Sequence, residues 1–171
     1  MSIKRLTIFL MLLWPTLAYP GEFVGQVGPV LPWKRDHQQT TSYRSWAGEV
    51  SYRTDWTDWL KAGVAVQGMW FRFPDTSSGY VVGVGPVVTG TWKLGENWFL
   101  HVPIGASFAY TDLDERCREI STDWNAIVHA GVALRYKSMF AEIRWQHMSN
   151  AHTNAPNIGF DWLVPMVGWR F

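Results

Sequence analysis

Three side chains near the carboxyl end of the sequence could together hydrolyse an ester. His147 and Ser149 are two residues apart, and Asp161 follows twelve residues after the serine. A hydroxyl nucleophile, an imidazole base and a carboxylate that orients the base are the parts of a serine hydrolase triad, which is recognised by the roles of its members and not by their order in the chain. These residues indicate acyl-transfer chemistry if one surface of the fold brings them together.

The elements that must position these residues are predicted from a period of two. Polar and apolar residues alternate from Trp98 to Tyr110 and from Trp124 to Tyr136, and this alternation is typical of β-strands with two different faces. Weaker alternation of the same kind predicts further strands at about 22–33, 42–53, 60–73, 79–93, 139–149 and 161–171. Eight strands long enough to cross a bilayer at a tilt predict an all-β fold, an eight-stranded antiparallel transmembrane β-barrel of the outer membrane.

The lengths of the connections agree with this topology. Alternate connections, at 34–41, 74–78, 111–122 and 150–160, are mostly long and polar, whereas the turns near 54–58, 93–97 and 137–138 are shorter. Outer-membrane barrels have short periplasmic turns and longer extracellular loops. Aromatic residues near the strand ends suit the girdles of such barrels: Trp92, Trp98, Tyr110, Trp124 and Tyr136. The final Phe171 resembles the signal read by the barrel-assembly machinery.

Three prolines fall inside predicted strands and oppose this interpretation. Pro86, Pro103 and Pro165 each remove a hydrogen-bond donor from the ladder, and a closed barrel has no edge strand to accommodate them. We therefore expect β-bulges or shifted strand ends at these positions. A secreted soluble barrel or sandwich is the alternative architecture, because it has the same period but turns its apolar face inward.

The composition narrows the class of protein. The 171 residues are 47% hydrophobic and 17% charged, which excludes a disordered chain. Their mean hydropathy of −0.09 excludes a bundle of membrane-spanning helices. The formal net charge of +1 leaves no basic surface for nucleic acid. The single cysteine, Cys117, excludes an intramolecular disulfide framework and a thiolate metal cluster.

The amino terminus predicts export. A basic pair and an apolar stretch at 4–14 precede a small-residue zone that ends at Ala18, and these are the three zones of a secretory signal peptide. The apolar stretch is too short for the roughly 20 residues of a spanning helix. We expect residues 1–18 to be removed and residues 19–171 to form the barrel in the outer membrane.

Parity along the last two strands places the candidate residues toward lipid. Glu142 and Arg144 belong in a polar lumen, because a charge on the lipid face costs about 2–4 kcal/mol near the midplane. His147 and Ser149 have the opposite parity, so they project from the lipid face. Asp161 shares the parity of the apolar residues of the last strand. We expect these three side chains to meet on the lipid face near the outer leaflet, if no bulge interrupts the ladder.

A local signature in this region resembles a known family. The run His147-Met148-Ser149-Asn150-Ala151, followed by Pro156-Asn157, Gly159 and Asp161, is similar to the signature of the outer-membrane lipid A 3-O-deacylases, the PagL family. Those proteins are eight-stranded barrels with a lipid-facing serine hydrolase site that cleaves the 3-linked acyl ester of lipid A.

The resemblance implies a role for each residue. Ser149 would be the nucleophile, His147 the general base, Asp161 the orienting acid and Asn150 a candidate oxyanion donor. The substrate and partner would be lipid A or lipopolysaccharide, with no metal or organic cofactor. The third member of the family's triad is usually Glu, so the shorter Asp161 requires either a closer approach of the two backbones or a weaker contact with His147.

Other functions stay open at this point. A non-enzymatic small outer-membrane barrel, serving as a structural or adhesive surface protein, has the same strand pattern. A palmitoyltransferase of the same barrel size would add an acyl chain to lipid A and not remove one. Association with a second copy as a homodimer is also open.

The remaining histidines and the cysteine suggest no second site. His101 and His129 lie on predicted lumen faces, where we expect them to form hydrogen bonds within a polar core. His37 and His152 fall in loops, and His152 is close enough to the candidate site to touch substrate. Cys117 lies in a run of mixed charge that is typical of a solvated loop.

Overall fold

The structure, a computed structural model, describes residues 20–32, 44–72, 78–113, 123–151, 153 and 159–171. The described residues form nine strands: β1 (Gly21–Pro29), β2 (Leu31–Pro32), β3 (Arg44–Thr57), β4 (Leu60–Arg72), β5 (Ser78–Lys93), β6 (Trp98–Asp112), β7 (Trp124–Tyr136), β8 (Met139–Ser149) and β9 (Phe160–Arg170). Within these ranges there is no helix of the length and apolar character needed to cross a membrane. The predicted signal peptide at 1–18, together with His37, Cys117 and His152, lies outside the described residues.

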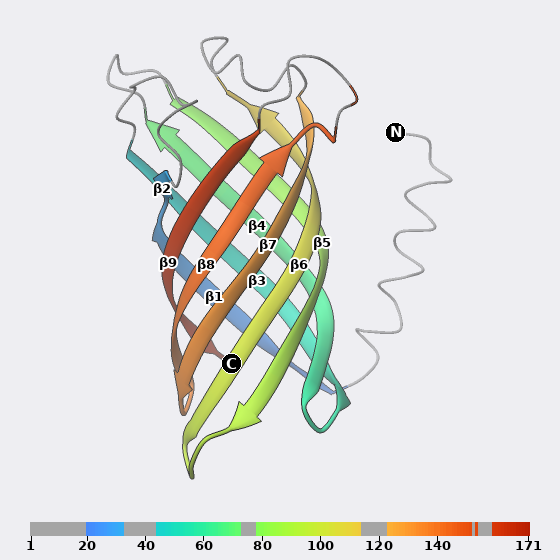
Figure 1. Cartoon of the computed structure of the whole chain (residues 1–171), viewed down its shortest axis with the longest axis vertical. Coiled ribbons are helices and arrows are strands. Elements are labelled where there is room, and N and C mark those ends of the chain that lie inside the picture. Colours follow the sequence, from blue (N-terminus) through green and yellow to red (C-terminus); the bar gives the residue numbers. More distant parts are fainter. Residues whose placement is uncertain (1–19, 33–43, 73–77, 114–122, 152, 154–158) are drawn as a thin grey trace.

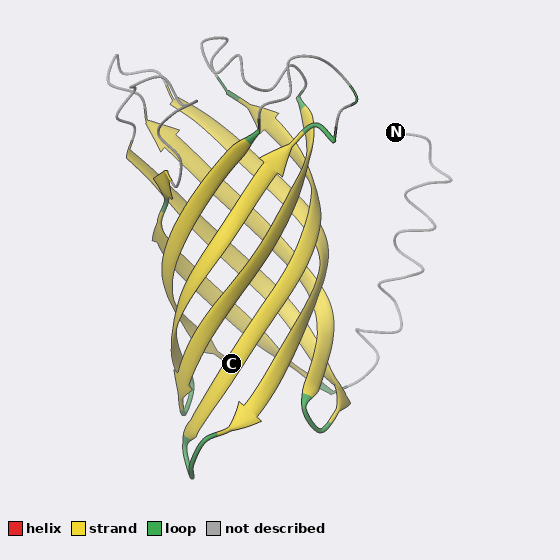
Figure 2. Ribbon diagram, viewed as in Figure 1, coloured by secondary structure: helices red, strands yellow, loops and turns green. Residues whose placement is uncertain are grey.

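The strands close into one antiparallel barrel. Each long strand pairs with its neighbour in the chain, and β1 pairs with β9 to close the sheet (Figures 1 and 2). β2 continues β1, because the pairs Val27–Val167 and Leu31–Leu163 are four residues apart on both strands and so keep one register. β1 and β2 therefore count as one strand, and the prediction of an eight-stranded antiparallel barrel is confirmed.

The prolines do not distort the ladders, so the expectation of bulges or shifted ends was wrong. Between β5 and β6 the pairs Val84–Phe108 and Val87–Gly105 are three residues apart on both strands, so the register passes Pro86 unchanged. Pro103 lies in the same way between two in-register pairs of the β6–β7 ladder. Pro165 pairs with Ile143 and, on its other side, lies in the gap between the β1–β9 and β2–β9 pairings. A lost donor therefore opens the ladder locally, while the bonds on either side hold the register.

The two ends of the barrel differ as the connection lengths predict. The turns at 58–59, 94–97 and 137–138 lie at one end, to which the carboxyl end of β9 also returns (Figure 1). The strand ends that flank the longer connections lie at the other end of the barrel (Figure 1). The predicted girdle residues are exposed on the outer surface at the ends of their strands: Trp92, Trp98, Tyr110, Trp124 and Tyr136. By the rule for outer-membrane barrels, the end with the longer connections is extracellular.

The lumen in the middle of the barrel is filled by a charged network. Arg144 is bonded to Glu49 through its terminal nitrogens and to Glu142 through Nε, at 2.6 Å. Arg53 donates to Glu49 at 3.3 Å, and Gln26 donates to the same carboxylate at 3.1 Å. The placement of Glu142 and Arg144 in the lumen is confirmed.

The lumen near the extracellular end contains a buried apolar cluster, which the sequence interpretation missed. Phe71, Ile127, Met148, Phe160 and Trp162 are buried there in one cluster. An eight-stranded barrel is only wide enough for its interior to be filled by side chains. Inward residues at this level therefore contact one another and not water, so apolar side chains are stable inside the barrel.

Candidate active site

β8 presents His147 and Ser149 on the outer surface of the barrel. Side chains along this strand alternate, with Glu142 and Arg144 buried in the lumen and Ile143 exposed to the outside. The β8–β9 ladder runs from Met139–Trp169 to Met148–Phe160 with no register shift. His147 and Ser149 therefore share the outer face, as their parity predicts.

The imidazole of His147 meets the carboxylate of Asp161 directly across the ladder. The two residues are a register pair of β8 and β9, and His147 Nδ1 lies 3.1 Å from Asp161 Oδ1. Both side chains are partly exposed. With the proton on Nδ1 donated to the carboxylate, Nε2 is free of a proton and can act as a base. Because the partners are directly opposite, an aspartate reaches the imidazole at an ordinary hydrogen-bond distance.

Ser149 ends β8 at its extracellular end. It pairs with Ala126 of β7 and stands two residues beyond His147 on the same face. Among the hydrogen bonds of the described residues, none joins Ser149 to His147. The structure thus brings His147 and Asp161 into contact and places Ser149 next to them along the strand.

Asn150 begins the connection that follows the candidate serine. It is 2% exposed, and its carbonyl accepts hydrogen bonds from the backbone N–H and the hydroxyl of Thr153, at 3.1 and 2.7 Å. These bonds close the first turn after β8. Pro156 and Asn157 lie outside the described residues.

Two further residues touch the imidazole and were not assigned a role from the sequence. Gly159 has a φ of +75°, and a Cβ on it would lie 2.8 Å from His147 Cε1 and 3.3 Å from Nε2. The indole of Trp145 stacks on the imidazole, with ring centroids 6.1 Å apart and planes at 17°. The contact of Trp145 could have been predicted from the sequence, because Trp145 lies two residues before His147 on the same face of the strand. Asp161, Gly159 and Trp145 thus surround the imidazole.

Buried aromatic packing supports the site from inside the barrel. Met148 and Phe160 form the register pair next to His147–Asp161, and their side chains point into the apolar cluster. Phe160 stacks on Trp162, with centroids 5.4 Å apart and planes at 6°. Sliding β9 along β8 would break this packing, which therefore holds Asp161 at the level of His147.

An apolar groove runs along the outer surface below the site. It has a volume of about 690 Å³ and lies over β1, β3 and β6 to β9. Its nearest members to the site are Ile143 and Pro165, a register pair that is separated from His147–Asp161 by only one other outward pair, Trp145–Leu163. The groove therefore begins one outward pair below the site and extends toward the periplasmic half of the barrel wall.

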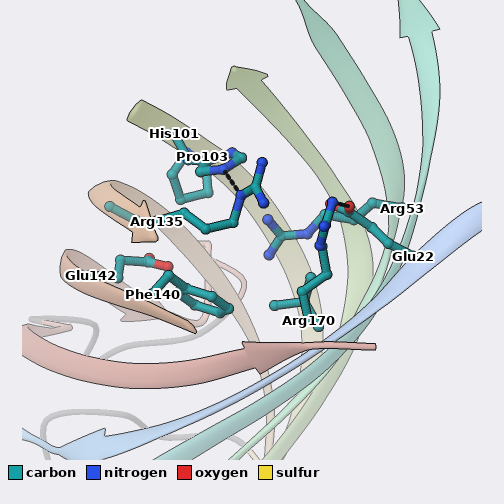
Figure 3. A pocket seen from close by; sticks show the side chains of 10 residues that line it. Glu22, Arg53, His101, Pro103, Arg135, Phe140, Glu142 and Arg170 are labelled. Carbon is teal, nitrogen blue, oxygen red and sulfur yellow. Dashed lines mark hydrogen bonds and ion pairs between the residues drawn. The ribbon is translucent and has the colours of Figure 1, made fainter. Parts of the chain in front are cut away.

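The lumen histidines lie away from this site. Figure 3 shows a small cavity inside the barrel that is lined by His101, Arg53, Arg135 and Arg170, among others. His101 bonds to Thr91 and accepts from Arg135 Nε, each at 3.0 Å, so its predicted hydrogen bonding is confirmed.

His129 is buried, but neither of its ring nitrogens has a hydrogen-bond partner among the described residues, so the predicted hydrogen bonding was wrong for this residue. The described part of the chain contains no group of three or more His, Cys, Asp or Glu residues that could hold a metal ion.

Comparisons with known proteins agree with this fold and identify a family. The family model for the lipid A 3-O-deacylases (PagL) matches residues 25–170. The crystal structure of the outer-membrane enzyme PagL superposes with a TM-score of 0.67 at 16% identity, covering 86% of this chain and 98% of that one. A de novo designed transmembrane β-barrel superposes with a TM-score of 0.50 at 12% identity, covering 90% and 98% of the two chains. No match to a curated protein sequence was found.

The two solved structures establish only the barrel fold, because sequence identities of 16% and 12% are too low to transfer a function. The family match covers most of the chain and includes His147, Ser149 and Asp161. The chain therefore belongs to the lipid A 3-O-deacylase (PagL) family, and is an ester hydrolase of the outer membrane built on an eight-stranded β-barrel.

Proposed function

We propose that this barrel removes the 3-linked acyl chain of lipid A through a triad of Ser149, His147 and Asp161. The observation that carries the proposal is the hydrogen bond between His147 Nδ1 and Asp161 Oδ1 at 3.1 Å, made on the outer face of the barrel. A base oriented by a carboxylate, with a hydroxyl two residues away on the same face, has the parts of an activated serine. Its location on the lipid side allows an ester to reach it from the bilayer.

In the proposed reaction, Ser149 Oγ attacks the acyl carbonyl while His147 Nε2 takes the hydroxyl proton. The carbonyl oxygen becomes an oxyanion in the tetrahedral intermediate. When this intermediate collapses, the bond to the sugar oxygen breaks and His147 returns the proton to that oxygen. Water, activated by the same imidazole, then opens the acyl-enzyme and releases a fatty acid. Asp161 keeps the proton on Nδ1 and stabilises the imidazolium at each step.

The depth of the site suits an ester at the base of a sugar headgroup. Asp161 and Phe171 are ten residues apart, which corresponds to about 33 Å of strand and about 24 Å of depth at a 45° tilt. This is close to the full height of the apolar band, so the triad stands at the outer interface. The apolar groove below it would take the acyl chain, which leaves the ester carbonyl beside Ser149.

Asn150 is the proposed donor to the oxyanion. It follows the nucleophile directly, and its burial and the two bonds to its carbonyl hold this turn in place. A donor fixed before the reaction stabilises the developing charge without reorganisation, and removal of one such donor typically costs about 10²–10³-fold in kcat.

The nucleophile is tested with Ser149→Ala. We expect this variant to lose all conversion of purified lipopolysaccharide, measured by mass spectrometry of the extracted lipid A as the loss of one acyl chain. Ser138→Ala, in a turn at the opposite end of the barrel, is the matched control and should keep full activity. Heat-modifiable migration on a gel checks that both variants fold. Complete deacylation by a folded Ser149→Ala protein would reject the triad.

A further inference from the structure

Four aromatic side chains form a continuous patch on the outer surface beside the candidate nucleophile. We call this patch the aromatic ledge; it consists of Tyr80 on β5, Phe108 and Tyr110 on β6, and Trp124 on β7, which are 44%, 54%, 37% and 52% exposed. Trp124 stacks on Phe108, with centroids 5.0 Å apart and planes at 9°, and meets Tyr110 edge-on at 5.2 Å. Tyr110 in turn contacts Tyr80 at 6.3 Å. The rings therefore brace one another and remain partly exposed on the outer surface.

The ledge adjoins Ser149 on the side away from Asp161. Ser149 pairs with Ala126, and Trp124 lies two residues from Ala126 on the same face of β7. Diagonal neighbours of this kind are about 7–8 Å apart, within reach of aromatic side chains. Asp161 lies across β8 on the opposite side, with the apolar groove below it. A substrate whose carbonyl is at Ser149 thus meets the groove on one side and the ledge on the other.

The ledge stands at the level of lipid headgroups. Tyr110 is twelve residues from Trp98 on β6, which corresponds to about 40 Å of strand and about 28 Å of depth at a 45° tilt. The two residues therefore lie at opposite interfaces of the apolar band. The outer margin of the ledge is polar, because Tyr80 with its phenol hydroxyl pairs across the ladder with Asp112.

We propose that the aromatic ledge is the subsite for the pyranose ring that carries the cleaved ester. A pyranose has an apolar face of C–H groups and a polar rim of hydroxyls. The exposed ring surfaces of Trp124 and Tyr110 match the C–H face, and the hydroxyl of Tyr80 with the carboxylate of Asp112 matches the rim. The proposal rests on the proposed function, since it takes Ser149 as the point to which the ester must be delivered.

The same strands contain a matched aromatic pair at the other interface. Trp98 and Tyr136 are on β6 and β7, with centroids 4.8 Å apart and similar exposure, but at the periplasmic end. If the ledge were only part of the interfacial girdle, replacing Trp124 or Tyr110 would have the same effect on the enzyme as replacing Trp98 or Tyr136. If the ledge binds a sugar ring, only its own residues affect the affinity for substrate.

The experiment compares Trp124→Leu and Tyr110→Leu with the controls Trp98→Leu and Tyr136→Leu in the full-length barrel in detergent. Kinetics with purified lipid A give kcat and KM for each variant. A sugar-free alkyl fluorophosphonate, which is attacked by Ser149 with loss of fluoride, reports on the nucleophile alone. We expect the ledge variants to raise KM for lipid A by about twofold to tenfold each, the scale of one aromatic contact. Their kcat and their rate of fluorophosphonate labelling should stay at the wild-type value, as should all parameters of the controls.

Equal changes in KM for both pairs, or unchanged KM for the ledge variants, would overturn the subsite. A fall in fluorophosphonate labelling in the ledge variants would also overturn it, because the ledge would then act on the nucleophile and not on the sugar. If Trp124→Leu does not fold, Tyr80→Leu at the far end of the ledge provides the same comparison. Wild-type protein that the probe does not label at Ser149 would instead reject the proposed triad, so the two failures are distinguishable.

Discussion

Replacement of Gly159 by alanine should displace the imidazole of His147, the proposed base, while leaving the barrel folded. The new Cβ would lie 2.8 Å from His147 Cε1, whereas ordinary contacts begin at 3.4 Å, so the ring must move by about 0.6 Å. The backbone cannot relieve the contact in the other direction, because the same Cβ would be 2.9 Å from the carbonyl oxygen of Met148. A displacement of 1 Å costs about 10²-fold in rate, so we expect kcat to fall on the order of tenfold to a hundredfold.

The same substitution has a separate cost in stability. Gly159 has a φ of +75°, and a residue with a Cβ in the left-handed region is destabilised by about 1–2 kcal/mol. Unfolding by guanidinium chloride in detergent micelles measures this free energy, and mass spectrometry of lipid A under single-turnover conditions measures the rate of the chemical step. Both quantities should fall in Gly159→Ala, with KM unchanged.

Gly95→Ala is the control, because the Cβ it adds in a turn at the opposite end meets nothing within 4 Å. We expect this variant to lie within about 0.5 kcal/mol of wild type in unfolding free energy and to keep its kcat. The decisive comparison is between the two readouts in Gly159→Ala. A loss of stability with a wild-type kcat would refute the reasoning, since it would mean that the glycine serves the backbone alone and does not hold the imidazole.

Two further predictions concern charged side chains. Asp161→Asn should lower kcat by about 10²–10⁴-fold, because an amide can donate to Nδ1 and hold the imidazole in the wrong tautomer; Asp161→Glu keeps a carboxylate and should retain more activity, and equal kcat in the two variants would argue against an orienting role. Arg144→Met should lower the unfolding free energy by about 3–5 kcal/mol, because it leaves Glu49 and Glu142 buried without their main partner. The double variant Glu49→Met/Arg144→Met should recover much of that loss in the same denaturant titration, and its failure to do so would show that the network contributes more than charge pairing.

Part of the site follows from the sequence because strand parity is a local property. His147 and Ser149 are two residues apart in one strand, and side chains two apart in a strand always share a face. Glu142 and Arg144 have the opposite parity, and their charges mark the face that points into the lumen, away from lipid. The outer location of the candidate nucleophile and base could therefore be predicted before any contact between strands was known.

The contact between the imidazole of His147 and the carboxylate of Asp161 could not be predicted from strand parity alone. Parity places Asp161 on the outer face, but only the register of β9 against β8 sets its level opposite His147, and the packing of Phe160 and Trp162 inside the barrel holds that register. The approach of Gly159 to the imidazole also needs the chain to return across the strand. Contacts between residues distant in sequence depend on how the strands are paired, and the alternation within each strand does not specify this pairing.

The prolines and the residues of the lumen show the same difference between what the local sequence indicates and what the closed barrel decides. From the sequence alone, a proline in a strand predicts a disrupted ladder, because it lacks a backbone N–H. Pro86 and Pro103 nevertheless lie in ladders whose neighbouring hydrogen bonds keep the register across the missing bond. In the sequence pattern, an inward apolar residue such as Ile127 interrupts a face that is otherwise polar. The alternation of side chains thus determined the strands, their faces and the lipid-facing pair on β8. Closure of the barrel decided the rest, because the radius of the closed sheet sets which inward side chains touch one another and which carboxylate stands opposite the base.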